Sequence, residues 1–286
     1  MATVLSMINL KGGVGKTQVS VGLAEFLVKQ KNKKVLVIDL DPQTNATVML
    51  IGDKKWKELN DEGKTLYQLF KDKIDTTELF DINESVIKKV SNINGGLHKL
   101  HLLPSSLDLI NIQDRIPSIS QDQFGVVTPS TILKSIILPF IEEEDYDYVI
   151  VDCPPNLGMI TLNGLMISDY FIIPTKADYI STYGIPQILD RIDKFNTVSK
   201  KDVKPLGIAI TLYSGHQRRL HDEVISMLEM DDLYPIVFES NIPYRQKIAE
   251  TSYYDGSSYT LKQKYGDAFD ILNELTNEIL EEIDEE

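Results

Sequence analysis

Short apolar runs alternate with amphipathic stretches along the 286-residue chain. Five runs are rich in aliphatic residues without strict polar alternation, which is typical of parallel strands covered by helices on both faces. They are residues 3–8, 34–39, 148–152, 170–174 and 206–211. Apolar residues at helical spacing fill residues 17–31, 184–195 and 220–228. The pattern predicts an α/β fold with a doubly wound, mostly parallel sheet and helices on both faces.

Residues 52–125 are less regular than the rest of the chain. Short helices are predicted at "TLYQLF" (65–70) and "NESVIKKV" (83–90), and a strand is predicted near "LHKLHLLP" (97–104). We find no internal repeat, low-complexity segment or Pro/Gly/Ser-rich linker. We therefore expect a single domain over residues 1–286, with an elaboration at about 52–125 and an acidic C-terminal helix.

Composition favours a reducing, aqueous compartment. No apolar run approaches the roughly 20 residues of a membrane-spanning helix, and the first residues do not resemble a signal peptide, so we expect a cytoplasmic protein. The only cysteine, Cys153, cannot form a disulfide within one chain. It is interpreted as a small packed residue at a strand end rather than a reactive thiol.

The net charge of −14 is unevenly distributed. Residues 270–286 hold eight acidic and no basic residues, so the preceding residues carry only −6. Residues 200–264 hold nine Lys/Arg and nine Asp/Glu, which leaves room for a local basic surface on a chain that repels polyanions overall.

The segment "INLKGGVGKTQVSV" (8–21) joins a predicted strand to a predicted helix through a glycine-rich turn. This is the context of a phosphate-binding loop, in which backbone N–H groups surround phosphate oxygens at a helix N-terminus. Lys16 would neutralise the β- and γ-phosphates, and the Thr17 hydroxyl would bind Mg²⁺. The alternative is a plain glycine turn with incidental charges. The predicted nucleotide-binding residues are Gly12, Gly13, Val14, Gly15, Lys16, Thr17 and Gln18.

Carboxylates follow the next predicted strand. Asp39 and Asp41 are two residues apart, so their side chains point similarly if the strand continues. Two carboxylates beside a nucleotide are costly without a cation, which Mg²⁺ would supply. The alternative is that "DLDP" is merely a solvated strand end.

Several blocks in the same order resemble one family. "KGGVGKT" resembles the deviant Walker A motif of the ParA/MinD superfamily of dimerising P-loop ATPases. "VLVIDLDPQTNAT" (35–47) resembles the switch I block of ParA/Soj-type partition ATPases, and residues 146–185 resemble their Walker B and switch II region. "IAITLY" (208–213) and "NIPYRQKIAET" (241–251) resemble the conserved segments near the C-terminal end of the same family. Residues 52–125 are the weakest part of the match.

The resemblance implies a role for each matching residue. Asp41 would orient the attacking water, Asp39 would lie near the water shell of the metal, and Asp152 would be the Walker B carboxylate that reaches Mg²⁺ through water. Lys11 would cross a dimer interface to contact the partner's nucleotide, so two ATP molecules would lie between two protomers. Asn241 and Pro243 would contact the adenine.

The resemblance also implies DNA binding and a partner protein. ParA-type ATPases bind double-stranded DNA non-specifically as ATP dimers, associate with the nucleoid, and are released when a ParB-like centromere-binding protein stimulates hydrolysis. The candidate DNA contacts are Arg218, Arg219, Arg245 and Lys247, although each could be an ordinary solvated charge. Tyr244 stands where relatives often have an arginine, so the register of Arg245 stays open.

Several other functions are compatible with parts of this sequence, and particular residues distinguish them. A related ATPase could position a protein cargo on the nucleoid, and a non-hydrolysing, nucleotide-gated scaffold would keep Lys16 without needing Lys11 or Asp41. A MinD-like ATPase needs a basic amphipathic C-terminal helix, but here acidic residues surround Ile279, Leu280 and Ile283, so we expect no membrane binding. An iron–sulfur reductase needs two cysteines per protomer, and this chain has only Cys153, so that function is excluded. A tyrosine kinase needs a terminal tyrosine cluster, whereas residues 253–259 precede another predicted helix.

Overall fold

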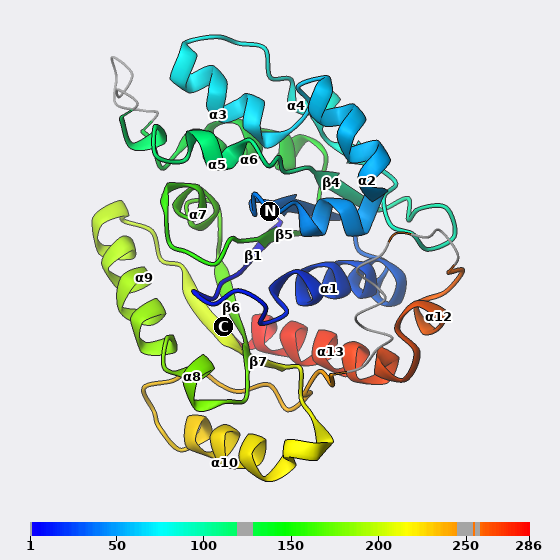
Figure 1. Ribbon diagram of the computed structural model, residues 1–286, viewed down its shortest axis with the longest axis vertical. Coiled ribbons are helices and arrows are strands. Elements are labelled where there is room, and N and C mark those ends of the chain that lie inside the picture. The colour runs from blue at the N-terminus through cyan, green and yellow to red at the C-terminus, as the bar shows by residue number, and fades with distance from the viewer. Residues whose placement is uncertain (1, 119–127, 245–253, 255–257) are drawn as a thin grey trace.

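The computed structural model describes residues 2–118, 128–244, 254 and 258–286. Within these residues, seven strands form one sheet in the order β3-β4-β2-β5-β1-β6-β7 (Figure 1). Neighbouring strands are parallel except at the β3–β4 edge. This arrangement confirms the predicted doubly wound, mostly parallel sheet. The strands are β1 (Thr3–Met7), β2 (Val35–Asp39), β3 (Ile87–Lys88), β4 (Leu100–Leu103), β5 (Tyr148–Asp152), β6 (Tyr170–Lys176) and β7 (Lys204–Thr211).

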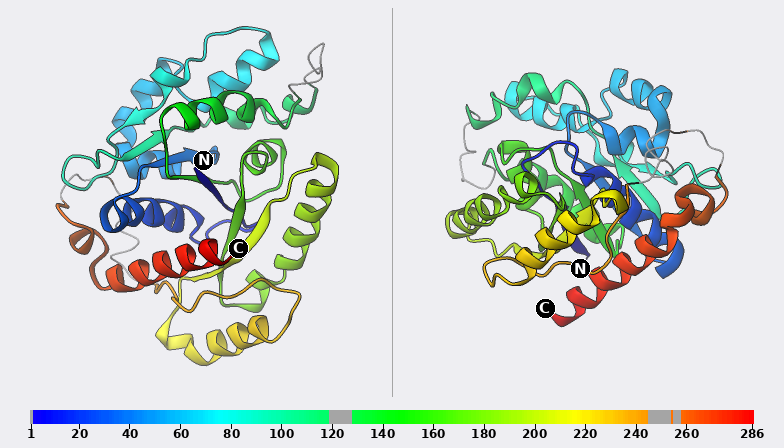
Figure 2. Two further views of the ribbon diagram at one scale, coloured as in Figure 1. Left: turned by 180° about the vertical axis from the view of Figure 1, so that it is seen from behind. Right: turned by 60° about the horizontal axis from the view of Figure 1, so that its bottom comes forward.

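Helices cover both faces of the sheet, and each face has its own buried apolar cluster (Figures 1 and 2). Successive strand residues alternate between the clusters, because side chains along a strand point to opposite faces. On one face lie α1 (Lys16–Lys31), α2 (Asn45–Asp61), α12 (Leu261–Tyr265) and α13 (Phe269–Glu285). On the other lie α3 (Leu66–Asp75), α5 (Leu109–Ile112), α6 (Ile132–Glu143), α7 (Met159–Leu165), α9 (Ile185–Ser199) and α10 (Arg218–Glu229).

The acidic C-terminal helix α13 lies against α1, the helix that follows the glycine-rich turn (Figure 1). Ile279 is fully buried in the cluster on that face, and Leu280 and Ile283 pack against it. The apolar stripe of α13 is therefore part of the core. No helix among the described residues is long and apolar enough to cross a membrane.

The segment after α10 returns to β7. Residues 236–244 run parallel to the strand through backbone bonds such as Ile242 N–H to the Ile210 carbonyl (2.9 Å) and Tyr244 N–H to the Tyr213 carbonyl (2.8 Å). The helix α10 therefore lies in a segment that leaves the end of β7 and returns to pair with the same strand.

Two local expectations differ from the structure. The helix predicted over residues 83–90 is a four-residue helix, α4 (Ile82–Ser85), followed by β3. Pairing with β4 at the sheet edge, rather than local propensity, decides the conformation of this segment. In addition, β2 ends at Asp39, so Asp41 does not continue the strand. The predicted strand near residues 97–104 is confirmed as β4.

Candidate nucleotide and metal site

The glycine-rich turn needs glycine for two separate reasons. Gly13 and Gly15 have φ of +70° and +79°, a region that other residues rarely adopt. A Cβ atom on Gly15 would also lie 3.3 Å from the Cβ of Thr211 on β7. The Thr211 hydroxyl in turn lies 2.7 Å from the Val14 carbonyl and 3.0 Å from the Thr175 carbonyl, so it can donate to either. The turn is thus packed against and hydrogen-bonded to β7.

The side chain of Lys16, at the start of α1, extends back towards the residues that precede this turn. Its ammonium donates to the Asn9 carbonyl (3.2 Å) and the Lys11 carbonyl (2.9 Å). Burial lowers the pKa of Lys16, and the nearby carboxylates Asp152 and Asp41 oppose that shift. A buried ammonium beside the backbone N–H groups of a helix start forms a site for an anion.

Asp152, the last residue of β5, accepts hydrogen bonds from two hydroxyl groups of α1. Thr17 Oγ1 lies 2.7 Å from Oδ2, and Ser20 Oγ lies 2.8 Å from Oδ1. Burial raises the pKa of Asp152 to about 6. Ser20 is a residue that we did not predict. Its position one helical turn after Lys16 could have suggested it, because i and i+4 share a helix face.

Asp39 lies beside Asp152 in the register of β2 and β5. Its carboxylate is fully buried and accepts from the backbone N–H (2.9 Å) and the hydroxyl (2.7 Å) of Thr47. Burial, and then repulsion by Asp152, raise the pKa of Asp39 well above its usual value. Two adjacent buried carboxylates are costly without a cation.

Asp41 reaches the site from the loop after β2. Its backbone N–H donates to Asp39 Oδ1 (3.1 Å), and its own Oδ1 accepts from the Gln43 N–H (2.9 Å). Asp41 is only 7% exposed, and burial raises its pKa. Both carboxylates therefore lie at this edge of the sheet, although a turn rather than a continued strand places the second one.

The oxygen atoms gathered here suit a small hard cation. Mg²⁺ prefers oxygen ligands and is usually held by one or two carboxylates together with phosphates and water. The Thr17 hydroxyl and the carboxylates of Asp39 and Asp152 supply such oxygens. A cation would also relieve the repulsion between the two carboxylates. Among the described residues, no group of three or more His, Cys, Asp or Glu side chains could hold a metal ion alone.

A cavity of about 420 Å³ joins the glycine-rich turn to the loop after β2. Three of the predicted nucleotide residues do not line it: Val14 lines a second cavity instead, and Asn241 and Pro243 are absent from the lining although their neighbour Tyr244 is part of it. The lining residues are Gly12, Gly13, Gly15, Lys16, Thr17, Gln18, Asp41, Gln43, Asn45, Val48, Met49, Pro155, Leu212 and Tyr244. The apolar members were not predicted, since only the folded chain brings them together.

Lys11 lies on the other side of the turn. It lines a second cavity of about 500 Å³ with Lys176, Asp178 and the short helix α8 (Tyr179–Thr182). The side of this cavity carries exposed apolar residues, with Ile180 75% and Tyr179 54% exposed. The carboxylate of Asp178 is engaged by the N–H and hydroxyl of Ser181, at 2.7 and 2.8 Å.

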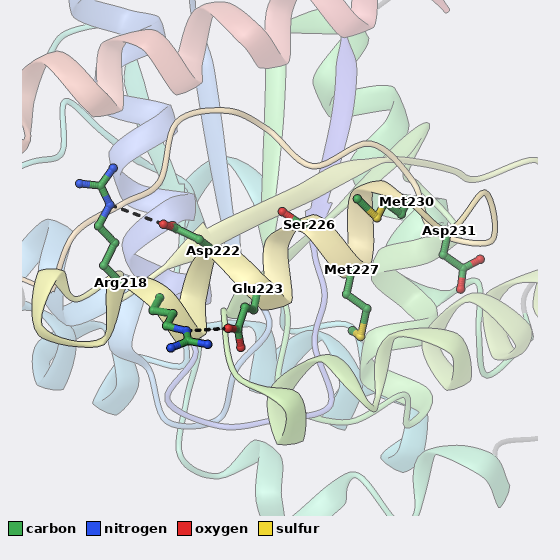
Figure 3. A pocket seen from close by; sticks show the side chains of 8 residues that line it. Arg218, Asp222, Glu223, Ser226, Met227, Met230 and Asp231 are labelled. Atoms are coloured by element: carbon green, nitrogen blue, oxygen red, sulfur yellow. Dashed lines mark hydrogen bonds and ion pairs between the residues drawn. The ribbon is translucent and has the colours of Figure 1, made fainter.

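The predicted DNA residues are only partly within the described chain. Arg218 and Arg219 begin α10 on its exposed side, with side chains 77% and 94% exposed. Each pairs with an acidic residue one turn later, Arg218 with Asp222 at 3.5 Å and Arg219 with Glu223 at 2.9 Å (Figure 3). Arg245 and Lys247 lie outside the described residues.

Comparison with known proteins agrees with this geometry. A family profile described as "AAA domain" matches residues 2–205. The chain is 33% identical to MJECL24 of Methanocaldococcus jannaschii, an uncharacterized protein, over 84% of this chain and 82% of that one. It is 29% identical to the sporulation initiation inhibitor Soj of Bacillus subtilis (85% and 86%) and 28% identical to ParA of Myxococcus xanthus (86% and 77%).

The chain belongs to the ParA/Soj family of P-loop ATPases. Solved structures share the ParA/Soj fold. Cyanothece McdA has a TM-score of 0.73 at 21% identity, covering 98% and 100% of the two chains. A plasmid partition protein from Borrelia burgdorferi has a TM-score of 0.64 at 22% identity (97% and 100%). Cobyrinic acid a,c-diamide synthase from Mycobacterium smegmatis, with bound ATP analogue and magnesium, has a TM-score of 0.66 at 25% identity (89% and 92%).

Proposed function

We propose that this protein is a partition ATPase of plasmid or chromosome segregation that dimerises with ATP and hydrolyses it slowly. The observation that carries the proposal is one cavity lined by the turn glycines, Lys16, Thr17 and Asp41, beside the Thr17–Asp152 hydrogen bond. Residues 1–286 would act as one ATPase domain in the cytoplasm, associated with the nucleoid.

The residues of this cavity would divide the chemistry between them. The N–H groups of the turn and the ammonium of Lys16 would bind the phosphates, and Thr17, Asp39 and Asp152 would hold the metal. Bound Mg²⁺ would neutralise charge that develops on the phosphate oxygens. Asp41 would orient the attacking water from the loop after β2. The relative solved with an ATP analogue and magnesium supports these cofactors.

The proposed dimer would place two ATP molecules between two copies of the chain. Lys11 supports this arrangement because it lines a separate cavity beside exposed apolar residues, rather than the cavity that contains Lys16. A lysine there can act on a neighbouring molecule's phosphates, and such a cation stabilises the transition state. A C2 dimer would use the same surface twice.

The test of this proposal is sedimentation with ATP and Mg²⁺, together with phosphate release. The wild type should shift from monomer to dimer on ATP, and Lys11→Ala should lose dimerisation or turnover while it still binds a fluorescent ATP analogue. Lys29→Ala, which removes an exposed lysine at the other end of α1, is the control and should behave as wild type. Dimerisation and turnover at wild-type levels in Lys11→Ala would refute the role in trans.

We also propose that the ATP dimer binds double-stranded DNA without sequence preference. Arg218 and Arg219 support this because they are highly exposed, although their acidic neighbours reduce the local positive charge. Arg245 and Lys247 would complete the surface. Duplex binding should need ATP and weaken steeply with salt, because phosphate contacts release counterions. Binding without ATP, or unchanged binding after Arg218→Glu with Arg219→Glu, would contradict the proposal.

The remaining partner would be a ParB-like protein that binds the centromere and stimulates hydrolysis. The second candidate function also relies on ATP-dependent dimerisation and hydrolysis. In it, the ATPase positions a protein cargo on the nucleoid instead of segregating DNA. The fold alone does not distinguish the two candidates. Pull-down with the product of a neighbouring gene distinguishes them, since a centromere-binding protein would support partition.

A further inference from the structure

The loop after β4 contacts the acidic loop after β2. Ser105, which is fully buried, donates its hydroxyl to the Asp41 carbonyl (2.8 Å) and its backbone N–H to Thr47 Oγ1 (3.0 Å). The Thr47 hydroxyl donates in turn to Asp39 Oδ2 (2.7 Å). One residue of the segment with the weakest family match therefore bonds both to Asp41 in the loop after β2, here called the acidic loop (residues 40–44), and to Thr47 at the start of α2.

We propose that Ser105 is a positioning residue that holds Asp41 in its working orientation. The inference rests on the proposed ATP hydrolysis, because it concerns the residue that would orient the attacking water. Ser105 does not line the nucleotide cavity, so it acts only through Asp41 and Thr47.

Asp41 is held by hydrogen bonds from within its own loop and by hydrogen bonds from the ends of sheet strands. The Asp41 carbonyl also accepts from the Thr44 N–H (2.9 Å), and the Asp41 carboxylate accepts from Gln43 (2.9 Å). Those bonds lie within the loop and would move with it. The Asp41 N–H, which donates to Asp39 Oδ1 (3.1 Å), holds the loop to the end of β2 on its amide side. The Ser105 hydroxyl holds the carbonyl side, from the loop that follows the neighbouring strand β4. Misplacing a catalytic group by about 1 Å can cost on the order of 100-fold in rate.

The same contact offers a spectroscopic signal. The indole N–H of Trp56, on α2, donates to the Ser105 carbonyl (3.1 Å). Trp56 is the only tryptophan in the chain, so its emission reports on one place. If Ser105 follows the acidic loop when nucleotide and metal bind, the emission of Trp56 changes. A chain of direct hydrogen bonds thus links the Asp41 loop to an intrinsic fluorophore.

The neighbouring residue Ser106 provides a matched control. It is equally buried, and its hydroxyl donates to Asn60 Oδ1 (2.6 Å), away from the acidic loop. Replacing either serine with alanine removes one buried hydroxyl and one side-chain donor, and the Ser106 change also removes the acceptor of the Asp108 N–H (3.1 Å). Ser106→Ala should therefore lose at least as much stability as Ser105→Ala, while only Ser105→Ala disturbs Asp41.

The experiment compares Ser105→Ala, Ser106→Ala and wild type in three measurements. These are thermal melting without nucleotide, steady-state ATP hydrolysis, and Trp56 emission during titration with Mg²⁺ and a non-hydrolysable ATP analogue. We expect Ser106→Ala to melt at or below the melting temperature of Ser105→Ala. We expect kcat to fall roughly tenfold in Ser105→Ala with KM little changed, because ground-state contacts remain. Ser106→Ala should keep both the rate and the emission change, whereas Ser105→Ala should lose much of each.

Equal rates and equal emission changes in the two serine variants would overturn the inference. If Ser105→Ala fails to fold, Thr47→Val and Thr47→Ser decide instead: the serine keeps the hydroxyl that links Ser105 to Asp39 and should restore the rate and emission change that valine removes. If the wild type does not hydrolyse ATP, the proposed activity fails, and the emission titration alone decides whether Ser105 follows the loop.

Discussion

Replacing Lys264 with methionine is expected to lower the free energy of unfolding by about 3 to 5 kcal/mol. Lys264, on α12, forms a buried ion pair with Glu25 of α1 at 2.7 Å, and the two side chains are 1% and 0% exposed. Methionine is close to lysine in length, so the substitution removes the charge and largely keeps the volume.

The magnitude follows from what Glu25 keeps after the substitution. Its carboxylate still accepts hydrogen bonds from the hydroxyls of Ser91 (2.6 Å) and Tyr265 (2.7 Å), so it remains partly solvated by the protein. It loses its only hydrogen-bonded cation among the described contacts and stays buried as an uncompensated charge. Removing one member of a buried pair typically costs more than the pair contributes, because the remaining charge is desolvated.

Urea unfolding at pH 7, followed by circular dichroism, measures the loss. Lys262→Met is the control, because Lys262 is an exposed lysine of the same helix and should change stability by less than about 0.5 kcal/mol. Adding Glu25→Gln to Lys264→Met removes the buried charge and should recover more than about 1 kcal/mol. A cost below about 1 kcal/mol for Lys264→Met alone would refute the reasoning.

Three further expectations concern other parts of the molecule. Thr211→Val should weaken binding of a non-hydrolysable ATP analogue about 5- to 30-fold by calorimetry, because the Val14 carbonyl loses a buried donor; an unchanged Kd would contradict this. Burial lowers the pKa of His101 to about 4, so the unfolded chain takes up its proton first and stability falls as pH drops from about 6.5 towards 4. Between pH 7 and 5 the loss should be about 2 kcal/mol in urea unfolding and smaller in His101→Gln; equal losses would argue against it. Asp41→Ala should retain ATP-dependent dimers while phosphate release stops, and rapid release would exclude Asp41 as the water-orienting residue.

The sequence predicted the central strands and the glycine-rich turn because local signals determine them. Continuous apolar runs mark strands buried on both faces, and left-handed backbone at Gly13 and Gly15 requires glycine. The sheet edge was less predictable, since β3 forms within a segment of helical pattern only because β4 lies beside it. The predicted packing of Cys153 is confirmed, because its thiol is fully buried and burial raises its pKa.

Parts of the site depended on long-range contacts that no short motif records. Tyr244 and Leu212 reach the nucleotide cavity because residues 236–244 return to β7, and Ser105 reaches Asp41 across two neighbouring strands. The acidic partners of Arg218 and Arg219 lie four residues away and could have been anticipated from helical spacing. The roles assigned to Lys11, Asn241 and Pro243 stay predictions.

The return of residues 236–244 to β7 has a consequence for how such proteins diversify. Because both ends of α10 are fixed on the strand whose Thr211 supports the glycine-rich turn, the helix can change its outer surface without altering the nucleotide cavity. The exposed Met227 of α10, and Met230 directly after the helix, do not line the nucleotide cavity (Figure 3). The fold thus separates the outer surface of α10 from the cavity, so substitutions on that surface can change what the helix contacts while the nucleotide site keeps its shape.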